Sequence, residues 1–281
     1  MRPDGIRVHD EDPMYDLIPQ FLAHRYDAMN MVTVDIPMQP LHDYMNQKRH
    51  EKQPVSHLAL IVSAYGRVAQ EFPKLNRFIS GSRKLFQHKN FTVSMVVMRP
   101  DSEGSAMSKF EVTAEDTIFT IQDKITSYIS TNRQANANSL DKWMKRLVRI
   151  GGLVQLFGIA ARFLDKHGLL PRSLCEASPF HASLLISNLA SIRVNHIYHH
   201  VYEFGTTSVA ITMGNPRMVA RESRGDVVFD KCIPLGVVMD ERIASGQYFG
   251  QAFARLKRYL AHPELLEQPF GQPLKEAKHA V

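Results

Sequence analysis

Residues 54–76 read PVSHLALIVSAYGRVAQEFPKLN, and this stretch sets the plan of the chain. Ser56 is a residue type that often caps the start of a helix. After it, apolar side chains recur at helical spacing, at Leu58, Ile61, Val62, Tyr65, Val68 and Phe72. Pro73 cannot continue a helix, because it lacks a backbone N–H. The sequence therefore predicts a long apolar helix that begins after Ser56 and ends before Pro73.

Strands are predicted on both sides of this helix. Before it, residues 32–38 alternate apolar and other side chains, which is the pattern of a half-buried strand. After it, Phe91–Met98 is the clearest strand, and residues 99–116 form either a loop or a strand pair. The last third of the chain adds strands at 182–187, 206–213 and 226–238.

Further helices are predicted at 14–22, 116–130, 140–164 and 247–260, so helices and strands are mixed along the chain. This mixture indicates an α/β or α+β fold with a mixed sheet. No repeat or sharp boundary divides residues 1–281. We therefore expect a single domain, with polar tails at about 1–12 and 267–281.

Composition narrows the function classes. No run of about 18 apolar residues is present, so a membrane-spanning helix is not expected. The two cysteines, Cys175 and Cys232, fit neither a disulfide framework nor a metal site, which favours a reducing, cytoplasmic location. The net charge of +6 suits nucleic acid, an anionic membrane or a polyanionic cofactor. Because no nucleic-acid-binding motif accompanies the charge, a nucleic-acid partner is not expected.

Four stretches in fixed order carry a family resemblance: residues 54–76, ISNL at 186–189, FGTTSVAITMG at 204–214, and 235–265 with its final RLKRYLAHPEL. Together they resemble the catalytic domain of the 2-oxoacid dehydrogenase acyltransferases, over about residues 14–266. That family shares its fold with chloramphenicol acetyltransferase. The resemblance therefore implies a two-layer sandwich of mixed sheet and helices. It also implies a homotrimer with active sites between subunits, and coenzyme A as carrier of the acyl group.

The resemblance does not extend to the accessory modules of that family. The lipoyl and subunit-binding modules that precede the catalytic domain in complex subunits have no counterpart before Asp12. We therefore expect neither a lipoyl attachment site nor a role as a core subunit of a dehydrogenase complex.

The catalytic motif of that family, Asp-His-x-x-x-Asp-Gly, corresponds here to DERIASG at 240–246. Asp240 and Gly246 match, and so does Arg242, but Glu241 replaces the catalytic histidine and Ser245 replaces the second aspartate. The chain thus resembles a divergent member of that family that lacks the catalytic histidine. Glu241 can act as a base only if burial raises its pKa towards neutrality. The alternative is a site that is inactive or works differently.

Other residues are candidates for the remaining roles. Ser187 corresponds to the serine that binds the oxyanion in the family, although a strand-end serine can also simply cap a turn. In the run HIYHH at 196–200, His199 or His200 could replace the missing base, or the run could be a surface cluster. No metal-ligand spacing is present, so no metal is expected.

Residues 142–164 are basic at first and then strongly apolar. Lys142 and Arg146, with Arg242, are candidates for binding the phosphates of coenzyme A. The apolar part could lie on a membrane surface, line a site for an acyl chain, or be buried at a trimer contact.

Two hypotheses follow. The chain is a coenzyme A-dependent acyltransferase with an altered site, which transfers an acyl group from acyl-CoA to an unknown acceptor. Alternatively, it is an inactive trimeric pseudoenzyme that serves as a ligand-binding or scaffold protein.

Overall fold

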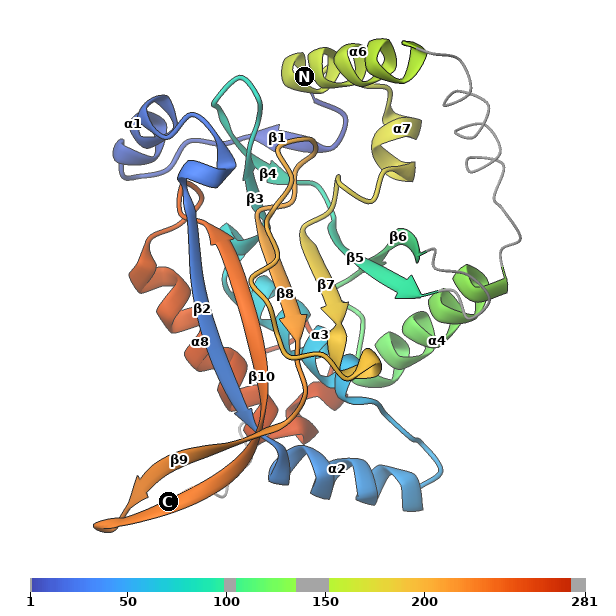
Figure 1. The fold of residues 1–281 in the computed structure, drawn as a ribbon, viewed down its shortest axis with the longest axis vertical. Helices are drawn as coiled ribbons and strands as arrows, with labels where there is room; N and C mark the ends of the chain where they lie inside the picture. Colours follow the sequence, from blue (N-terminus) through green and yellow to red (C-terminus); the bar gives the residue numbers. More distant parts are fainter. Residues whose placement is uncertain (1, 99–104, 135–151, 274–281) are drawn as a thin grey trace.

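A computed structural model describes residues 2–98, 105–134 and 152–273 of the chain. Its centre is a mixed sheet of seven strands, shown in Figure 1. The strands are β2 (Met29–Pro37), β5 (Phe91–Met98), β6 (Ser105–Val112), β7 (Leu184–Asn188), β8 (Val209–Met213), β9 (Arg217–Ser223) and β10 (Asp226–Asp240). They lie in the order β2-β10-β8-β7-β5-β6, and β9 pairs with the first part of β10.

Strand direction confirms the expected mixed sheet. β7 runs parallel to both β5 and β8. The other neighbours, β2 with β10, β10 with β8, β9 with β10, and β5 with β6, are antiparallel. β10 is the longest strand, and only its second part, from Cys232 onwards, is continuously buried.

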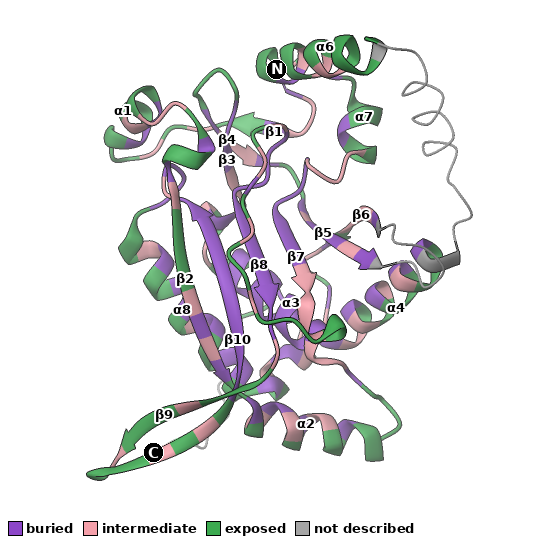
Figure 2. Ribbon diagram, viewed as in Figure 1, coloured by how far each residue is buried: buried purple, intermediate pink, exposed green. Residues whose placement is uncertain are grey.

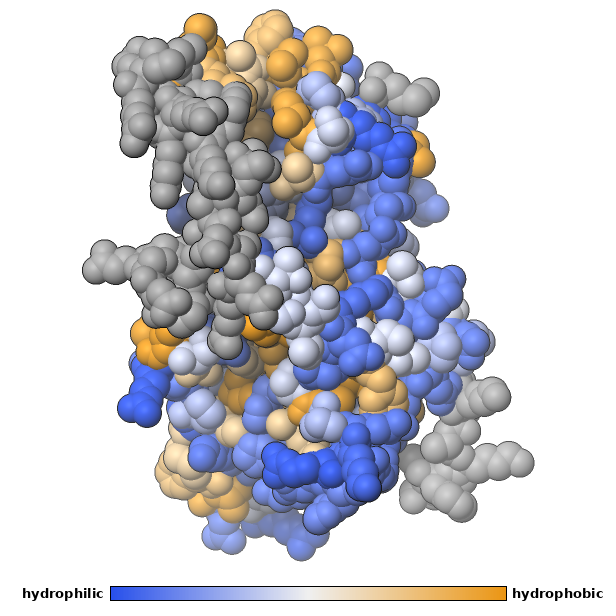
Figure 3. Space-filling view, turned by 90° about the vertical axis from the view of Figure 1, so that its right-hand side faces the viewer, coloured by the Kyte–Doolittle hydropathy of each residue, from blue (hydrophilic) through white to orange (hydrophobic). Residues whose placement is uncertain are grey.

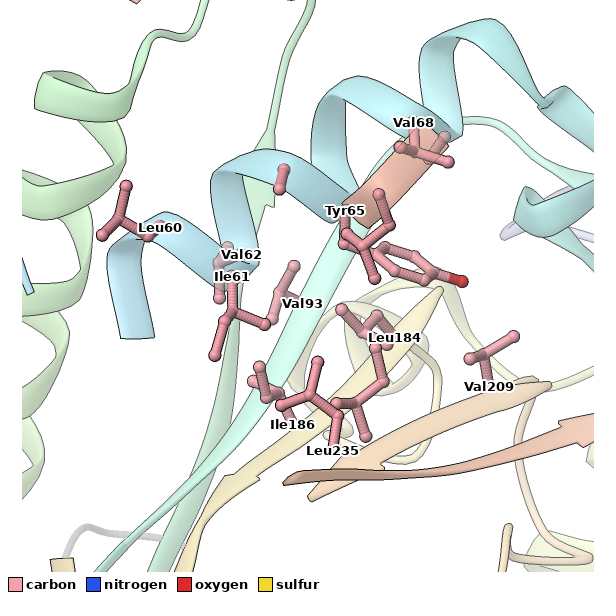
Figure 4. Packing of buried hydrophobic residues seen from close by; sticks show 14 of the residues in the cluster. Leu60, Ile61, Val62, Tyr65, Val68, Val93, Leu184, Ile186, Val209 and Leu235 are labelled. Carbon is pink, nitrogen blue, oxygen red and sulfur yellow. The ribbon is translucent and has the colours of Figure 1, made fainter. Parts of the chain in front are cut away.

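One face of the sheet is covered by helices α2 (Met38–His50), α3 (His57–Glu71), α4 (Ile118–Gln134) and α8 (Gly246–Ala261). α3 is the predicted apolar helix, and the Ser56 side chain caps it by accepting a hydrogen bond from the Ala59 amide at 3.2 Å. Every residue from Leu58 to Ala69 is buried, so α3 is enclosed on all sides (Figure 2). Figure 4 shows α3 beside the apolar side chains of β5, β7 and β8, including Val93, Leu184 and Val209.

A smaller antiparallel sheet of β1 (Gly5–Arg7), β4 (Leu85–His88) and β3 (Arg77–Ile79) lies at one end of the molecule. Helices α1 (Met14–Phe21), α6 (Leu153–His167) and α7 (Arg172–Ala177) lie at the same end. α6 is the described part of the helix predicted at 140–164, and Gly168, with φ of 70°, ends it as expected.

The segments expected as polar tails pack against the body where they are described. Arg2 is buried and donates to Asp4 and Asp165. At the other end of the chain, Phe270 is buried and its amide donates to the Asp116 carbonyl at 3.0 Å. Local composition did not reveal the contacts with Asp165 and Asp116, because they join residues far apart in the sequence.

None of the described helices combines the length and the apolar character that crossing a membrane would require.

Candidate active site

The turn that follows β10 is built on a buried carboxylate. Asp240, the last residue of β10, is fully buried and accepts two hydrogen bonds from the Arg242 guanidinium, at 2.8 and 2.7 Å. The Arg242 amide donates to the same carboxylate at 3.1 Å, which closes the turn on itself. The remaining Arg242 Nη donates to the Leu22 carbonyl at 3.0 Å. Asp240 and Arg242 therefore fix the backbone of residue 241 between them.

A second arginine completes this scaffold. Arg25 is buried, and its Nε lies 3.9 Å from the Asp240 carboxylate. Its guanidinium also donates to the carbonyls of Tyr202, Ile79 and Gly205. Burial lowers the pKa of Arg25, and the attraction of Asp240 opposes that shift. Sequence reasoning missed Arg25, since its contacts come from segments more than 50 residues away.

Glu241 lies outside this buried scaffold. Its amide donates to the Ala28 carbonyl at 2.9 Å, which ties the turn to the residue before β2. Its carboxylate is half-buried and accepts a hydrogen bond from the Asn30 amide group at 2.7 Å. A single copy of the chain thus does not supply the burial that a glutamate base requires.

Ser245 has a local structural role. It is exposed, and its hydroxyl accepts a hydrogen bond from the Tyr248 amide at 3.2 Å, which caps the N-terminus of α8. Arg242 is also committed, because its guanidinium is buried against Asp240 and Leu22. This geometry favours a positioning role for Arg242 over the expected contact with coenzyme A. Lys142 and Arg146 lie outside the described residues.

Ser187 stands in a row of small or hydroxyl residues that crosses the sheet. In the strand register, Ser187 on β7 pairs with Thr212 on β8, Thr212 pairs with Gly236 on β10, and Gly236 pairs with Thr33 on β2. Paired residues of neighbouring strands point to the same face. We call these four residues the hydroxyl row. It lies on the face opposite the helices, because the flanking Ile186, Ile211 and Leu235 belong to the helix-side core.

Ser187 and Glu241 are not brought together within one chain. Residue 241 is five positions beyond Gly236, the member of the hydroxyl row on β10. At about 3.4 Å per residue, this places Glu241 roughly 17 Å along the strand from the level of Ser187. The two candidate catalytic residues therefore lie at opposite ends of the sheet in a single copy.

The segment 193–204, which contains the histidine run, crosses the open face of the sheet above the hydroxyl row (Figure 1). His196 Nε2 lies 3.0 Å from Thr33 Oγ1, and the Tyr198 hydroxyl lies 2.7 Å from the same atom. Thr212 Oγ1 accepts from the Ile197 amide at 3.1 Å and donates to the Ile197 carbonyl. His196 Nδ1 is buried without a hydrogen-bond partner. His196, rather than the neighbouring histidines, is the one that reaches the row.

His199 and His200 stack on each other at 4.8 Å between ring centroids, and His199 Nδ1 lies 2.8 Å from the His200 carbonyl. Neither has a described contact with Ser187 or Glu241, so their proposed role as a replacement base gains no geometric support from the single chain.

Among the described residues, the group closest to a metal-binding set is Asp4, Cys175 and His181. The Asp4 carboxylate already accepts a hydrogen bond from Arg2. Burial raises the pKa of the Cys175 thiol to about 12, which disfavours the thiolate that would bind a metal.

The arrangement of the sheet and helices matches known structures. The dihydrolipoamide acetyltransferase of Azotobacter vinelandii superposes with a TM-score of 0.60 over 92% of this chain and 94% of that chain, at 14% identity. A probable dihydrolipoamide acetyltransferase of Listeria monocytogenes superposes with a TM-score of 0.59 over 92% of this chain and 95% of that chain, at 13% identity. A chloramphenicol acetyltransferase superposes with a TM-score of 0.54 over 91% of this chain and 99% of that chain, at 10% identity. The chain has the chloramphenicol acetyltransferase fold.

This acyltransferase fold is what the family resemblance implied, and the match covers nearly the whole chain. The sequence itself has diverged far from these proteins. No protein-family model matches it, and no curated protein is similar enough to match. At identities of 14% or less, the likeness establishes the fold alone.

Several site residues carried no signal that sequence reasoning used. Asn30, the partner of Glu241, lies just before the predicted alternation at 32–38, and Thr33, the partner of His196, lies within it. That alternation indicates which face a residue occupies, but it does not reveal which distant residue lies opposite. Gly214 and Gly236 did offer a signal, since glycine within a strand region often marks a close backbone approach.

Proposed function

We propose that the chain is a coenzyme A-dependent acyltransferase whose active site forms between neighbouring copies of a homotrimer. The observation that carries this proposal is the position of Glu241 and Ser187 at opposite ends of one sheet, in a fold shared with acetyltransferases. Two candidate groups that cannot meet within one chain can meet across a subunit boundary. The Azotobacter structure was determined to study a serine, a histidine and an asparagine in catalysis. Its histidine and asparagine are four positions apart, as are Glu241 and Ser245.

The chemistry assigned to the site is acyl transfer from the coenzyme A thioester. A base removes the proton from the hydroxyl, amine or thiol of the acceptor, and the freed electron pair attacks the thioester carbonyl. The Ser187 hydroxyl donates a hydrogen bond to the oxyanion of the tetrahedral intermediate. The carbon–sulfur bond then breaks, and the coenzyme A thiolate takes up the proton held by the base. Glu241 of a neighbouring copy is our candidate for that base, because it stands at the position of the catalytic histidine in the motif at 240–246.

The alternative is an inactive trimer that binds an acyl-thioester or serves as a scaffold. It is favoured by a specific observation: Glu241 is held by Asn30 and Ser245 caps α8, so both substituted positions have local partners. The buried, unpaired thiols Cys175 and Cys232 agree with a cytoplasmic location under either proposal.

Release of coenzyme A thiol from a panel of acyl-CoAs tests the first proposal. We expect release above the uncatalysed rate, with Ser187→Ala lowering kcat about 100-fold, as for loss of an oxyanion donor elsewhere. Glu241→Gln should lower kcat by a factor of about 100 or more if Glu241 is the base. Calorimetry with coenzyme A on the same variants separates binding from turnover.

Ser191→Ala is the matched control for Ser187→Ala, since Ser191 lies four residues further on, is exposed, and donates only to the Asn188 carbonyl. It should leave the rate unchanged. Saturable binding of coenzyme A without thiol release from any acyl-CoA would reject the transferase and support the inactive alternative. An unchanged rate in Glu241→Gln would reject the glutamate base.

A further inference from the structure

One end of the molecule presents an unusual concentration of exposed apolar side chains on α6. Ile159 is 66% exposed, and Leu156 and Phe163 are 62% and 58% exposed. Leu169, which follows the helix, is 63% exposed. Figure 3 shows hydrophobic residues gathered at this end. Contiguous apolar surface of this kind marks a protein or membrane contact in a water-exposed protein.

The charges of α6 suit a negatively charged partner. Its one acidic residue, Asp165, points into the molecule, where it accepts from Arg2 at 2.6 Å and lies 3.2 Å from His181. Arg162 and Lys166 are exposed on the helix. α6 therefore offers solvent an apolar stripe flanked by positive charge, which is the pattern of a helix that lies in a membrane interface.

A cavity of about 620 Å³ adjoins the C-terminal end of α6, and its lining combines cations and hydroxyls with the apolar side chains of Ile6 and Phe86. Its charged or polar lining consists of Arg2, Arg7, Ser80, Ser82, Lys84, Lys89, Lys166 and His167, without a carboxylate. Arg7, Lys84, Lys89 and Lys166 are exposed, and none of them has an ion-pair partner within the described part of the chain. Several unpaired cations around one cavity repel each other, so an anion that binds there relieves an unfavourable interaction.

The cavity and the apolar stripe belong to one continuous surface. Lys166 and His167 belong to the last turn of α6 and line the cavity. Gly81, between β3 and β4, packs against Lys166 so closely that an added Cβ would lie 2.9 Å from its Cα. The strands and the helix that surround the cavity are therefore held together, and a single ligand can use both features.

We propose that this end of the molecule binds the surface of an anionic membrane, with α6 at the level of the acyl chains and the cavity around a phosphate-bearing lipid headgroup. Exposed Ile, Leu and Phe side chains match acyl chains, and lysines match headgroup phosphates. An acidic protein segment would satisfy the cations but would leave the apolar stripe without a partner. The proposal does not depend on turnover of acyl-CoA.

Co-sedimentation with vesicles tests this. The full chain should bind vesicles of phosphatidylcholine and phosphatidylglycerol, and should bind pure phosphatidylcholine vesicles much more weakly. Lys84→Gln, Lys89→Gln and Lys166→Gln together should weaken binding about 100-fold, since each lysine near such a surface contributes roughly five-fold. Raising the salt from 0.05 to about 0.5 M should weaken binding of the unmodified chain, because exposed charges are screened.

A control variant loses the same charge elsewhere: Lys231, Lys257 and Arg258, all exposed, are changed to Gln. It should bind as the unmodified chain does. Ile159→Ser with Phe163→Ser should weaken binding by about ten-fold or more. Its own control is Val227→Ser with Phe229→Ser, on the β9–β10 hairpin at the opposite end of the molecule (Figure 1).

Three outcomes would overturn the proposal. Equal binding to vesicles with and without phosphatidylglycerol would show that the cations do not contribute to binding. Equal losses in the two triple variants would reduce the effect to net charge. Binding of inositol phosphates or of an acidic peptide, without binding to vesicles, would assign the cavity to a water-borne anion instead of a lipid headgroup.

Discussion

Asp240 is a carboxylate held in the interior between two arginines. The Arg242 guanidinium donates two hydrogen bonds to it, and Arg25 Nε lies 3.9 Å away. The single negative charge of Asp240 therefore partly neutralises the positive charges of both arginines. Charges withdrawn from water are tolerated only when they are paired and hydrogen-bonded. The turn that presents Glu241 depends on this arrangement, although Glu241 itself takes no part in it.

Replacing Asp240 by Asn should lower the free energy of unfolding by about 3–5 kcal/mol, because it leaves two buried guanidinium groups without a counter-charge. Urea denaturation measures the loss. The control is Asp35→Asn, which breaks the exposed ion pair with Arg217 and should cost less than about 1 kcal/mol. Similar losses in the two variants would show that the buried pair has no special importance.

Among the elements, the segment 193–204 shows how two glycines shape the open face of the sheet. At Gly214 an added Cβ would overlap the His196 amide, and at Gly236 it would overlap the Ile197 carbonyl. The absence of side chains there lets the backbone of the crossing segment rest directly on β10 and on the end of β8. That contact places His196 over Thr33.

Gly214→Ala should therefore lower the free energy of unfolding by about 1–3 kcal/mol, since the new methyl group pushes the crossing segment away. Gly250→Ala gives the contrast, because Gly250 lies within α8 and an added Cβ there meets no atom within 4 Å. It should raise stability by about 0.5–1 kcal/mol. Thermal unfolding compares the two, and a stabilising Gly214→Ala would refute the close approach.

Elements with strong local signals were predicted well. The apolar helix and the strand Phe91–Met98 match α3 and β5, and the strand predicted at 226–238 runs on to Asp240. β9 was missed because Arg217–Ser223 is almost wholly exposed and has no apolar face to signal a strand. α7 is only six residues long and was also missed.

The candidate site was predicted only in part. The motif at 240–246 and Ser187 could be located because each is a short local pattern. The distance between Ser187 and this motif could not be predicted, because it depends on the strand register, in which Ser187 pairs with Thr212 and Thr212 pairs with Gly236. The roles of Arg25 and Asn30 depend on the same long-range pairing.

In the whole molecule, His88 joins the smaller sheet to the segment that leads into β8. Its Nε2 donates to the Thr206 carbonyl at 3.2 Å, and its ring packs on Phe78 with 4.5 Å between centroids. Burial lowers the pKa of His88 from 6.5 to about 3, although Asp4 and the Thr206 carbonyl oppose the shift. His57, which is also partly buried, has its pKa lowered in the same sense.

This shift predicts that stability falls as the pH falls below about 6.5. Above pH 6.5, His88 is neutral in both the folded and the unfolded state. Below pH 6.5, His88 becomes protonated in the unfolded chain but stays neutral in the folded chain, so protonation stabilises the unfolded state. Between pH 7 and pH 5 the loss from His88 should be about 2 kcal/mol. His88→Gln keeps a donor for Thr206 and should remove that part of the pH dependence in urea titrations. An unchanged slope would exclude His88 as the responsible group.

The closed turn at Asp240 has an evolutionary consequence. Because Asp240 and Arg242 hold the backbone without help from the side chains at 241 and 245, both positions can change while the fold persists. An aspartate at 245 would cap α8 as well as Ser245 does, and a histidine at 241 would need no rearrangement of the core. The side chains at 241 and 245 can therefore be exchanged without loss of the buried scaffold that holds the turn.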